Sequence, residues 1–349
     1  MTRVKIRLSL IIASWLALLG LAGQPVHAAS GTNNGAQYTV SPVIPNNQRT
    51  SVSSYFDLIV KPGQKQDLTV AVTNQSSAPR TLHLSLTTAF TQHNGVIGYT
   101  PGGPRDGSAE YRLAELGQPS QTIVLAPGQT RNATVTLTIP AKGFKGVLLG
   151  GLYIVDKQKS AGGETDGIKL KNQFATVIGV QLQTSPGAVN YVKHDLKLTG
   201  VGAGVQSNQP GVLATIQNPT PSFWGKMHFM AKVYRRNTKT VVMQNSHTNY
   251  AVAPNSHFDY GILQKNALEP GDYTLDLKIE SPNGNWHWRR NFSILTAQAD
   301  KINRQLQLKR PFIMPWWGWL LIGLGLATLV WVIIFFSRRR RSANQTKEA

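Results

Sequence analysis

An uncharged apolar segment near the C-terminus constrains the fold of this chain more than any other feature. Residues 316 to 336, 21 positions in all, contain no Asp, Glu, Lys or Arg. At 1.5 Å per residue, a helix of this length spans the hydrocarbon core of a bilayer, which is about 30 Å thick. The alternative is a buried core helix, but such a helix is not expected to be apolar on every side. The segment therefore predicts one membrane-spanning helix.

Both edges of this segment carry residues that favour a membrane interface. Tryptophan rings favour the headgroup level, and basic residues accumulate on the cytoplasmic side. Three tryptophans stand at the start of the segment and four arginines follow its end. We expect these seven residues to anchor the helix: Trp316, Trp317, Trp319, Arg338, Arg339, Arg340 and Arg341.

The N-terminus has the pattern of a secretory signal peptide. Three basic residues lie within the first seven positions, an apolar run covers residues 8 to 22, and Val26 and Ala28 precede a plausible cleavage site. An uncleaved anchor is the alternative, but the short run favours a cleaved signal over residues 1 to 28. Because bases flank both ends of the later span, export of the N-terminus decides the orientation. We predict a single-pass cell-membrane protein with an extracellular N-terminus and a cytoplasmic tail.

Charge and cysteine content narrow the class of partner and of organism. The formal net charge is +20, and the exported part has 28 Lys and Arg against 15 Asp and Glu, a net charge of +13. Outside a cell, such a surface favours anionic wall polymers and acidic proteins over nucleic acid. The chain has no cysteine, which indicates an exported bacterial protein that relies on hydrophobic cores instead of disulfides. The exported part is long enough for two such cores.

Alternating apolar residues predict that the exported part is all-β. Leu68, Val70 and Val72 share one face of a run whose intervening residues are polar, and Leu275, Leu277 and Ile279 repeat the pattern. A period of two with one apolar face is typical of a sheet packed on one side. Pro-Gly turns precede three of these runs, at residues 62–63, 127–128 and 270–271. Recurrent turns of this kind are typical of immunoglobulin-like sandwiches.

The predicted architecture is two immunoglobulin-like β-sandwich domains in series, followed by one C-terminal transmembrane helix. The polar stretch after the apolar run at residues 146–155 indicates either a linker between the domains or a long hairpin loop. The predicted boundaries are a signal at 1–28, a first domain at 37–157, a linker at 158–168, a second domain at 169–297, a stalk at 298–315, the membrane helix at 316–336 and the basic tail at 337–349.

No combination of residues in the sequence indicates a catalytic, cofactor-binding or metal-binding site. There is no thiol nucleophile, no Gly-x-Ser-x-Gly elbow, no His-Glu-x-x-His motif and no phosphate-binding loop. The histidines lack metal-ligand spacing, and no pair of acids is singled out for glycoside cleavage. We therefore expect a protein that is not an enzyme and holds no cofactor. Exposed aromatics could contact a ligand, although core packing is their default role; the candidates are Tyr55, Phe56, Trp286 and Trp288.

Five segments in order give the chain a resemblance to the WxL-interacting proteins of Gram-positive bacteria. Three of them resemble the N-terminal, peptidoglycan-binding domain: VSPVIPNNQ at 40–48 continuing to KPGQ at 61–64, NGVI at 94–97 and GVLLGGLY at 146–153. Two resemble the C-terminal, host-binding domain: APNSHF at 253–258 and GDYTL at 271–275. The resemblance implies a cell-wall location and three partners, namely WxL-domain surface proteins, peptidoglycan or another anionic wall polymer, and host extracellular matrix. The chain lacks a WxL domain and a Leu-Pro-x-Thr-Gly sorting signal.

Three functions are consistent with these patterns. The first is a non-catalytic, membrane-anchored adaptor that binds a WxL-type surface protein, wall polymer and host matrix. The second is a lectin-like binder of wall glycan or teichoic acid, which sedimentation with wall sacculi before and after removal of teichoic acid would distinguish. The third is a wall hydrolase with an unrecognised acid pair, which release of sugar or peptide from sacculi would reveal.

Overall fold

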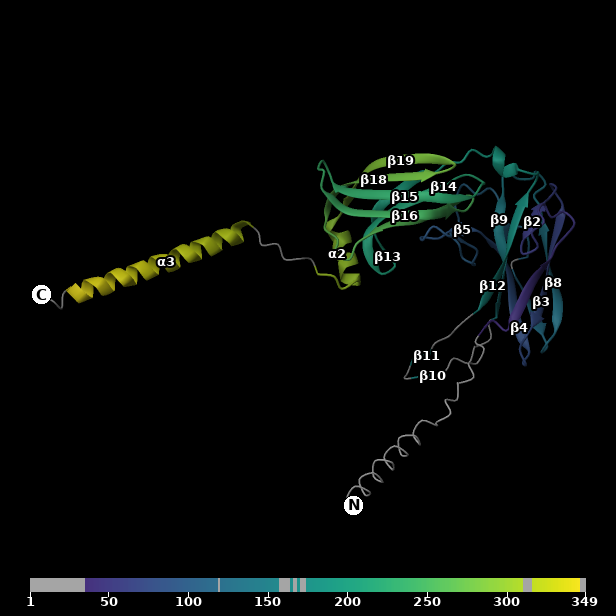
Figure 1. The fold of residues 1–349 in the computed structure, drawn as a ribbon, viewed down its shortest axis with the longest axis horizontal. Helices are drawn as coiled ribbons and strands as arrows, with labels where there is room; N and C mark the ends of the chain where they lie inside the picture. The colour runs from purple at the N-terminus through teal and green to yellow at the C-terminus, as the bar shows by residue number, and fades with distance from the viewer. Residues whose placement is uncertain are drawn as a thin grey trace, which may run out of the picture.

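The computed structural model describes residues 35–118, 120–156, 164–165, 168–169, 174–309 and 316–345. The predicted signal at 1–28, most of the predicted linker and the end of the basic tail lie outside these residues. Figure 1 shows two β-sandwiches set at an angle, followed by a separate C-terminal helix. The predicted fold class, two all-β sandwich domains and one apolar C-terminal helix, is confirmed.

The first sandwich packs a three-stranded sheet against a five-stranded sheet. The three-stranded sheet has the order β1 (Tyr38–Val43), β3 (Lys65–Asn74) and β8 (Thr130–Thr138). The five-stranded sheet has the order β2 (Phe56–Ile59), β12 (Ala175–Gln183), β9 (Leu148–Asp156), β4 (Arg80–Thr88) and β7 (Ser120–Leu125). The predicted apolar faces meet between them: Leu68, Val70 and Val72 are fully buried. Burial of each such side chain stabilises the folded state by about 1.5–3 kcal/mol.

The strand order places one strand on the other side of the predicted boundary between the domains. The run that we expected to open the second domain at residue 169 is β12, and β12 pairs antiparallel with β9 and parallel with β2. It therefore completes the first sandwich, and the second sandwich begins after the short helix η2 (Ala188–Tyr191). Periodicity identifies a strand but not its partner, so the sequence could not have assigned β12 to one sandwich or the other.

The second sandwich packs sheets of three and four strands. Their orders are β13 (Lys197–Gln206), β14 (Gln209–Asn218) and β17 (Ser256–Leu263), and then β16 (Val241–Val252), β15 (Trp224–Arg235), β18 (Gly271–Ser281) and β19 (Gly284–Ile294). Phe229 and Tyr260 lie at the centre of this core with their ring centroids 5.0 Å apart. The remaining short elements are η1 (Leu113–Glu115), β10 (Glu164–Thr165) and β11 (Ile168–Lys169).

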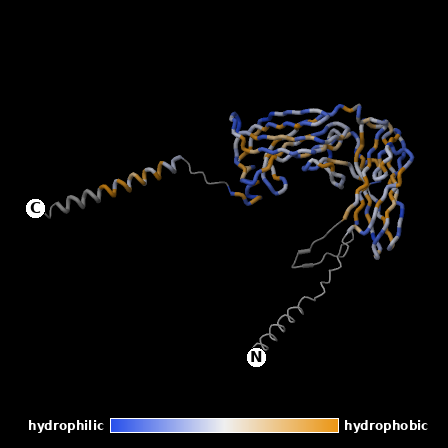
Figure 2. Tube along the Cα trace, in the orientation of Figure 1, coloured by the Kyte–Doolittle hydropathy of each residue, from blue (hydrophilic) through white to orange (hydrophobic). Residues whose placement is uncertain are grey.

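Two helices follow, and the first differs from the predicted stalk. Helix α2 (Thr296–Gln305) lies against the second sandwich, where Ala299 and Ile302 join its core. Asn303 donates to the Leu268 carbonyl at 3.0 Å and accepts from the Leu268 amide at 2.8 Å. The start of the expected stalk is thus part of the folded domain. Helix α3 (Trp316–Gln345) contains an apolar stretch of 19 residues that is not buried in the protein, visible as the orange segment in Figure 2.

A hairpin of the first sandwich joins the two sandwiches. It comprises β5 (Phe90–Thr91) and β6 (Ile97–Gly98) and reaches the β16–β17 edge of the second sandwich. The Ala251 amide donates to the Gly95 carbonyl at 2.7 Å, and the buried hydroxyls of Thr91 and Ser256 lie 2.8 Å apart. A small apolar cluster of Ala89, Val147, Leu149 and Ala253 lies beside them. This β5–β6 joint fixes the angle between the domains.

A buried carboxylate strengthens the joint. Asp106, from the first sandwich, accepts hydrogen bonds from Gln217 at 2.8 Å and His257 at 2.7 Å in the second sandwich, and from the amide and hydroxyl of Ser108. Burial alone would raise the pKa of Asp106, but these donors outweigh it and lower the pKa below its ordinary value of 3.8. The ionised carboxylate is therefore the form that holds the sandwiches together.

Replacing Gly95 by alanine should weaken the joint. Gly95 has φ +74°, and a Cβ there would lie 2.1 Å from the Tyr250 ring. Gly102 has φ +84° but open space around it, so Gly102→Ala carries the backbone strain without the clash. We expect Gly95→Ala to lower the free energy of unfolding by about 1–3 kcal/mol more than Gly102→Ala, in denaturant titrations. Equal losses in the two variants would contradict the role of this contact.

Acid should weaken the joint through Asp106. A depressed pKa in the folded state means that the carboxylate stabilises the fold above pH 3.8, and that this stabilisation is lost as the pH falls through the lowered folded value. Asp106→Asn should lose about 1–3 kcal/mol at pH 7. Its melting temperature should then fall less than that of the wild type between pH 5 and pH 2.5, in circular dichroism melts. A parallel decline would show that other groups control the acid response.

Candidate functional site

The four aromatic residues that the sequence nominated as ligand contacts lie in different environments in the structure. Phe56 is fully buried in the core of the first sandwich, so no ligand reaches its ring. Trp286 and Trp288 are half-buried and pack against the core of the second sandwich, where Trp286 stacks on Trp224. Tyr55 is half-buried on the outer side of the five-stranded sheet, because its neighbour Phe56 takes the inner side. Of the four, Tyr55 alone therefore lies partly exposed on an outer sheet face.

Two glycines lie near Tyr55 in the five-stranded sheet. Gly151 of β9 and Gly179 of β12 lie directly opposite one another in the five-stranded sheet. A Cβ on Gly151 would lie 2.7 Å from the Val177 side chain, and one on Gly179 would lie 3.5 Å from the Cβ of Tyr55. The glycines therefore allow the neighbouring side chains to approach the backbone closely.

Two further tyrosines complete this surface. Tyr153 pairs across the sheet with Val177 on the same outer face, one row beyond the glycines. The carbonyl of Tyr99 accepts a hydrogen bond from Thr87, which pairs with Gly151, at 2.7 Å. Burial raises the pKa of the Tyr99 hydroxyl, and the nearby Tyr55 raises it further. We call this surface of Tyr55, Tyr99, Tyr153, Gly151 and Gly179 the tyrosine face.

The tyrosine face has the chemistry of a stacking surface. Tyrosine offers a flat apolar ring and a hydroxyl that donates and accepts hydrogen bonds. All three rings are partly exposed, and the five residues of the face are uncharged. The arrangement suits the faces and hydroxyl groups of sugar rings. The sequence pointed to Tyr55 alone; the missed signal was a glycine amid an apolar run in each of two strands, at 151 and 179.

Apart from the tyrosine face, a hollow lies at the junction of the two sandwiches. It has a volume of about 710 Å³. The hairpin contributes Gln92, His93 and Asn94, and the second sandwich contributes Asn245 and His247. Seven of the sixteen lining residues carry amide or imidazole side chains, and the aromatic residues Phe90, Tyr250 and Phe258 also line the hollow. This junction groove depends on the β5–β6 joint, because each domain supplies one wall.

The predicted membrane anchors lie on helix α3. The side chains of Trp316, Trp317 and Trp319 are 77%, 55% and 65% exposed, at the start of the apolar stretch. Arg338, Arg339, Arg340 and Arg341 lie in the last part of the same helix, beyond that stretch. Both sets therefore flank an apolar stretch of α3 that is not buried inside the protein.

Comparison with known families matches both domains in chain order. Residues 38–156 match the WxL Interacting Protein peptidoglycan binding domain, and residues 165–304 match the WxL Interacting Protein host binding domain. A search of curated proteins gives no match. The family boundary at residue 165 assigns β12 to the host-binding region, whereas its pairing with β9 and β2 makes it part of the first sandwich.

Solved structures with a related arrangement are distant. The class 5 fimbriae chaperone CfaA is 11% identical, with a TM-score of 0.27 over 74% of this chain and 99% of that one. The Pseudomonas aeruginosa CupB2 chaperone is 13% identical, with a TM-score of 0.26 over 68% and 96%. A PapD-like domain of human CEP192 is 14% identical, with a TM-score of 0.24 over 43% and 86%. These scores are too low to bear on function.

Fold and surfaces together define a two-domain, immunoglobulin-like binding protein with an apolar C-terminal helix. Both domain models match in the expected order, and the chain belongs to the WxL-interacting protein family. It is a cell-surface binder built from a peptidoglycan-binding domain and a host-binding domain.

Proposed function

We propose that the chain is a single-pass membrane protein whose two sandwiches stand outside the cell, in the wall zone. The supporting observation is helix α3, whose 19-residue apolar stretch is long enough to cross a bilayer and is not buried inside the protein. The tryptophans at its start and the arginines beyond its end suit the two interfaces. The basic tail is then cytoplasmic.

The protein acts there as a non-catalytic adaptor that holds peptidoglycan and a WxL-domain surface protein together and offers a second domain to host matrix. The two matched domains are both binding domains, which supports binding without chemistry. The β5–β6 joint supports a combined role for the two domains, because it holds them in one relative orientation. A net charge of +13 on the exported part suits anionic wall polymers.

The tyrosine face is the surface that contacts the glycan strand of peptidoglycan. It lies in the domain whose family binds peptidoglycan, and its rings are uncharged and partly exposed. Stacking on such rings contributes about 1 kcal/mol each. Two rings together therefore account for a large share of a weak, multivalent wall interaction.

Deleting residues 310–349 should release the protein from the membrane. After digestion of the wall with a muramidase, the truncated chain should appear in the soluble fraction, while the full chain should stay in the membrane pellet. Fractionation and immunoblotting measure this partition. Wall digestion is needed because peptidoglycan binding alone would retain either form. A truncated chain that still pellets with membranes would contradict anchoring by α3.

Truncating the tyrosines should weaken binding to the wall. Tyr55→Ala and Tyr153→Ala should each weaken sedimentation of the detergent-solubilised chain with purified sacculi about fivefold, from the loss of about 1 kcal/mol of stacking. Tyr234→Ala is the matched control, because Tyr234 is a half-buried tyrosine on an outer sheet face of the other domain. If the control and the two variants bind alike, the tyrosine face is not the glycan contact.

The junction groove supports a second candidate function, a lectin-like binder of wall glycan or teichoic acid. Its amide and imidazole side chains suit the hydroxyl groups of a polyol or sugar. Sedimentation with sacculi before and after removal of teichoic acid distinguishes the two functions. Loss of binding after removal favours the second, whereas retained binding together with pull-down of a WxL-domain protein favours the adaptor.

A further inference from the structure

Half of one strand lacks a neighbour along one side. β9 pairs with Ala175 to Leu182 of β12, but on the other side β2 pairs only with Val180 to Gln183. β2 is four residues long and β12 is nine. In the part of the chain that the structure describes, no strand pairs with Ala175 to Gly179 on the β2 side, although β1 lies near this edge and its Tyr38 hydroxyl donates to the Phe174 carbonyl at 3.2 Å. Unpaired edges of this kind are templates for an added strand.

The other sheet edges of the first sandwich are either hydrogen-bonded to neighbouring residues or interrupted by a proline. Asn47 and Arg49 exchange backbone hydrogen bonds with β2 at 2.7–3.1 Å. β1 carries Pro42, which has no amide to donate. The Thr138 amide of β8 donates to Leu116 at 2.7 Å. On β7, Gln121 bonds across to the Thr134 carbonyl of β8 at 3.2 Å.

The sheet edges of the second sandwich are closed against one another. Arg290 of β19 donates to the Leu198 carbonyl of β13 at 2.9 Å. Asn245 of β16 donates to the Gly261 carbonyl of β17 at 2.7 Å. The β5–β6 hairpin covers the same side of β16 and β17. Among the described strands, the first half of β12 is thus the edge best suited to pairing.

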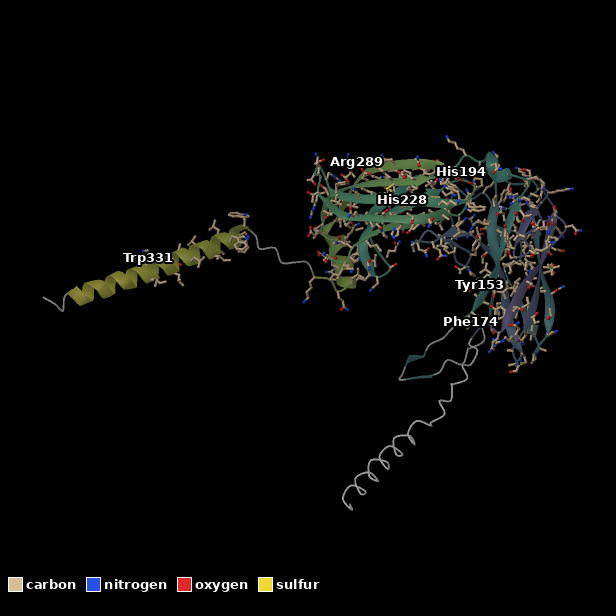
Figure 3. The ribbon with its side chains drawn as sticks, viewed as in Figure 1. Tyr153, Phe174, His194, His228, Arg289 and Trp331 are labelled. Carbon is tan, nitrogen blue, oxygen red and sulfur yellow. The ribbon has the colours of Figure 1, made fainter. Side chains whose placement is uncertain are left out.

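The surroundings of this edge are apolar. Val177 is 36% exposed and Phe174 is 38% exposed, so both present apolar surface beside the edge. Figure 3 shows Phe174 and Tyr153 on the same side of the first sandwich. Residues 174–179 include no charged side chain. A charged or strongly polar segment would lose hydration here without gaining a partner.

We propose that an extended, uncharged segment of a protein partner, with apolar side chains at alternate positions, adds as a strand to Ala175–Gly179. This inference rests on the proposed adaptor function and names the surface that the WxL-domain partner uses. A strand of five residues spans about 16 Å, which matches the unpaired length. Backbone hydrogen bonds supply affinity, and Val177 selects the alternating apolar side chains.

A protein segment fits this edge better than a glycan. The edge presents a row of backbone N–H and C=O groups at the spacing of a strand, and only another peptide backbone repeats that spacing. A glycan would be held by ring faces, which the adjoining tyrosine face supplies. The two surfaces meet at Gly179, so the wall polymer and the protein partner would lie side by side.

The test is hydrogen exchange of the full chain in detergent, alone and with a purified WxL-domain protein as the probe. We expect those amides of residues 175–179 that point away from β9 to exchange at least tenfold more slowly in the complex, because the others are already paired with β9. Val177→Lys should weaken capture of the probe about tenfold, because it removes the burial of one valine and places a charge at the edge. Phe174→Lys is a second variant with the same expectation.

The matched control is Val124→Lys, a 58% exposed valine of β7 in the same sheet. Circular dichroism melts of all three variants check that they are folded. If the wild type does not capture the probe, the adaptor function fails and the inference fails with it. If the wild type captures the probe but the amides of 175–179 that point away from β9 stay unprotected and Val177→Lys binds normally, the strand-addition site alone is overturned. Protection of these amides in the absence of the probe, by another copy or by the chain's own residues, would also overturn it.

Discussion

The contact between the β5–β6 hairpin and the second sandwich is the interaction on which the arrangement of this protein depends. Each sandwich has its own core, so each could remain folded with any mutual orientation. The buried Thr91–Ser256 pair, the Gly95–Ala251 backbone bond and the Asp106 carboxylate remove that freedom. Polar groups buried at such a boundary are specific, because any other orientation would leave them without partners.

This specificity has a functional counterpart. The junction groove exists only while both walls are held in place, and the tyrosine face ends at Tyr99, which packs against the apolar cluster of the joint. A change at the joint therefore alters binding surfaces that it does not touch. In the proposed function, the two surfaces that face wall polymer would thus be linked through the geometry of the joint.

The sequence predicted the fold because period-two alternation is a local property. The faces of residues 68–72 and 275–279 follow from neighbouring residues, and the structure buries the expected side of each. The features that the sequence did not predict are contacts between residues that lie far apart along the chain. The sequence could not show that β12 belongs with β9, that Asp106 meets His257 across 151 positions, or that Gly151 faces Gly179. Of the aromatic candidates, Phe56 and Tyr55 are neighbours in sequence, but the alternation of the strand sends one to the core and the other outward.

The docking of α2 has a consequence for reach. Because Asn303 closes this helix onto Leu268, the folded domain extends to residue 305, and only ten residues separate α2 from α3. Fully extended, ten residues cover about 35 Å at most. With α3 in a bilayer, the host-binding sandwich is tethered at the inner surface of the wall, and the peptidoglycan-binding sandwich is the one that follows it outward. Any contact with host material must then occur where the wall is thin, newly made or open. The order of the domains along the chain thus limits where the protein can meet its outermost partner.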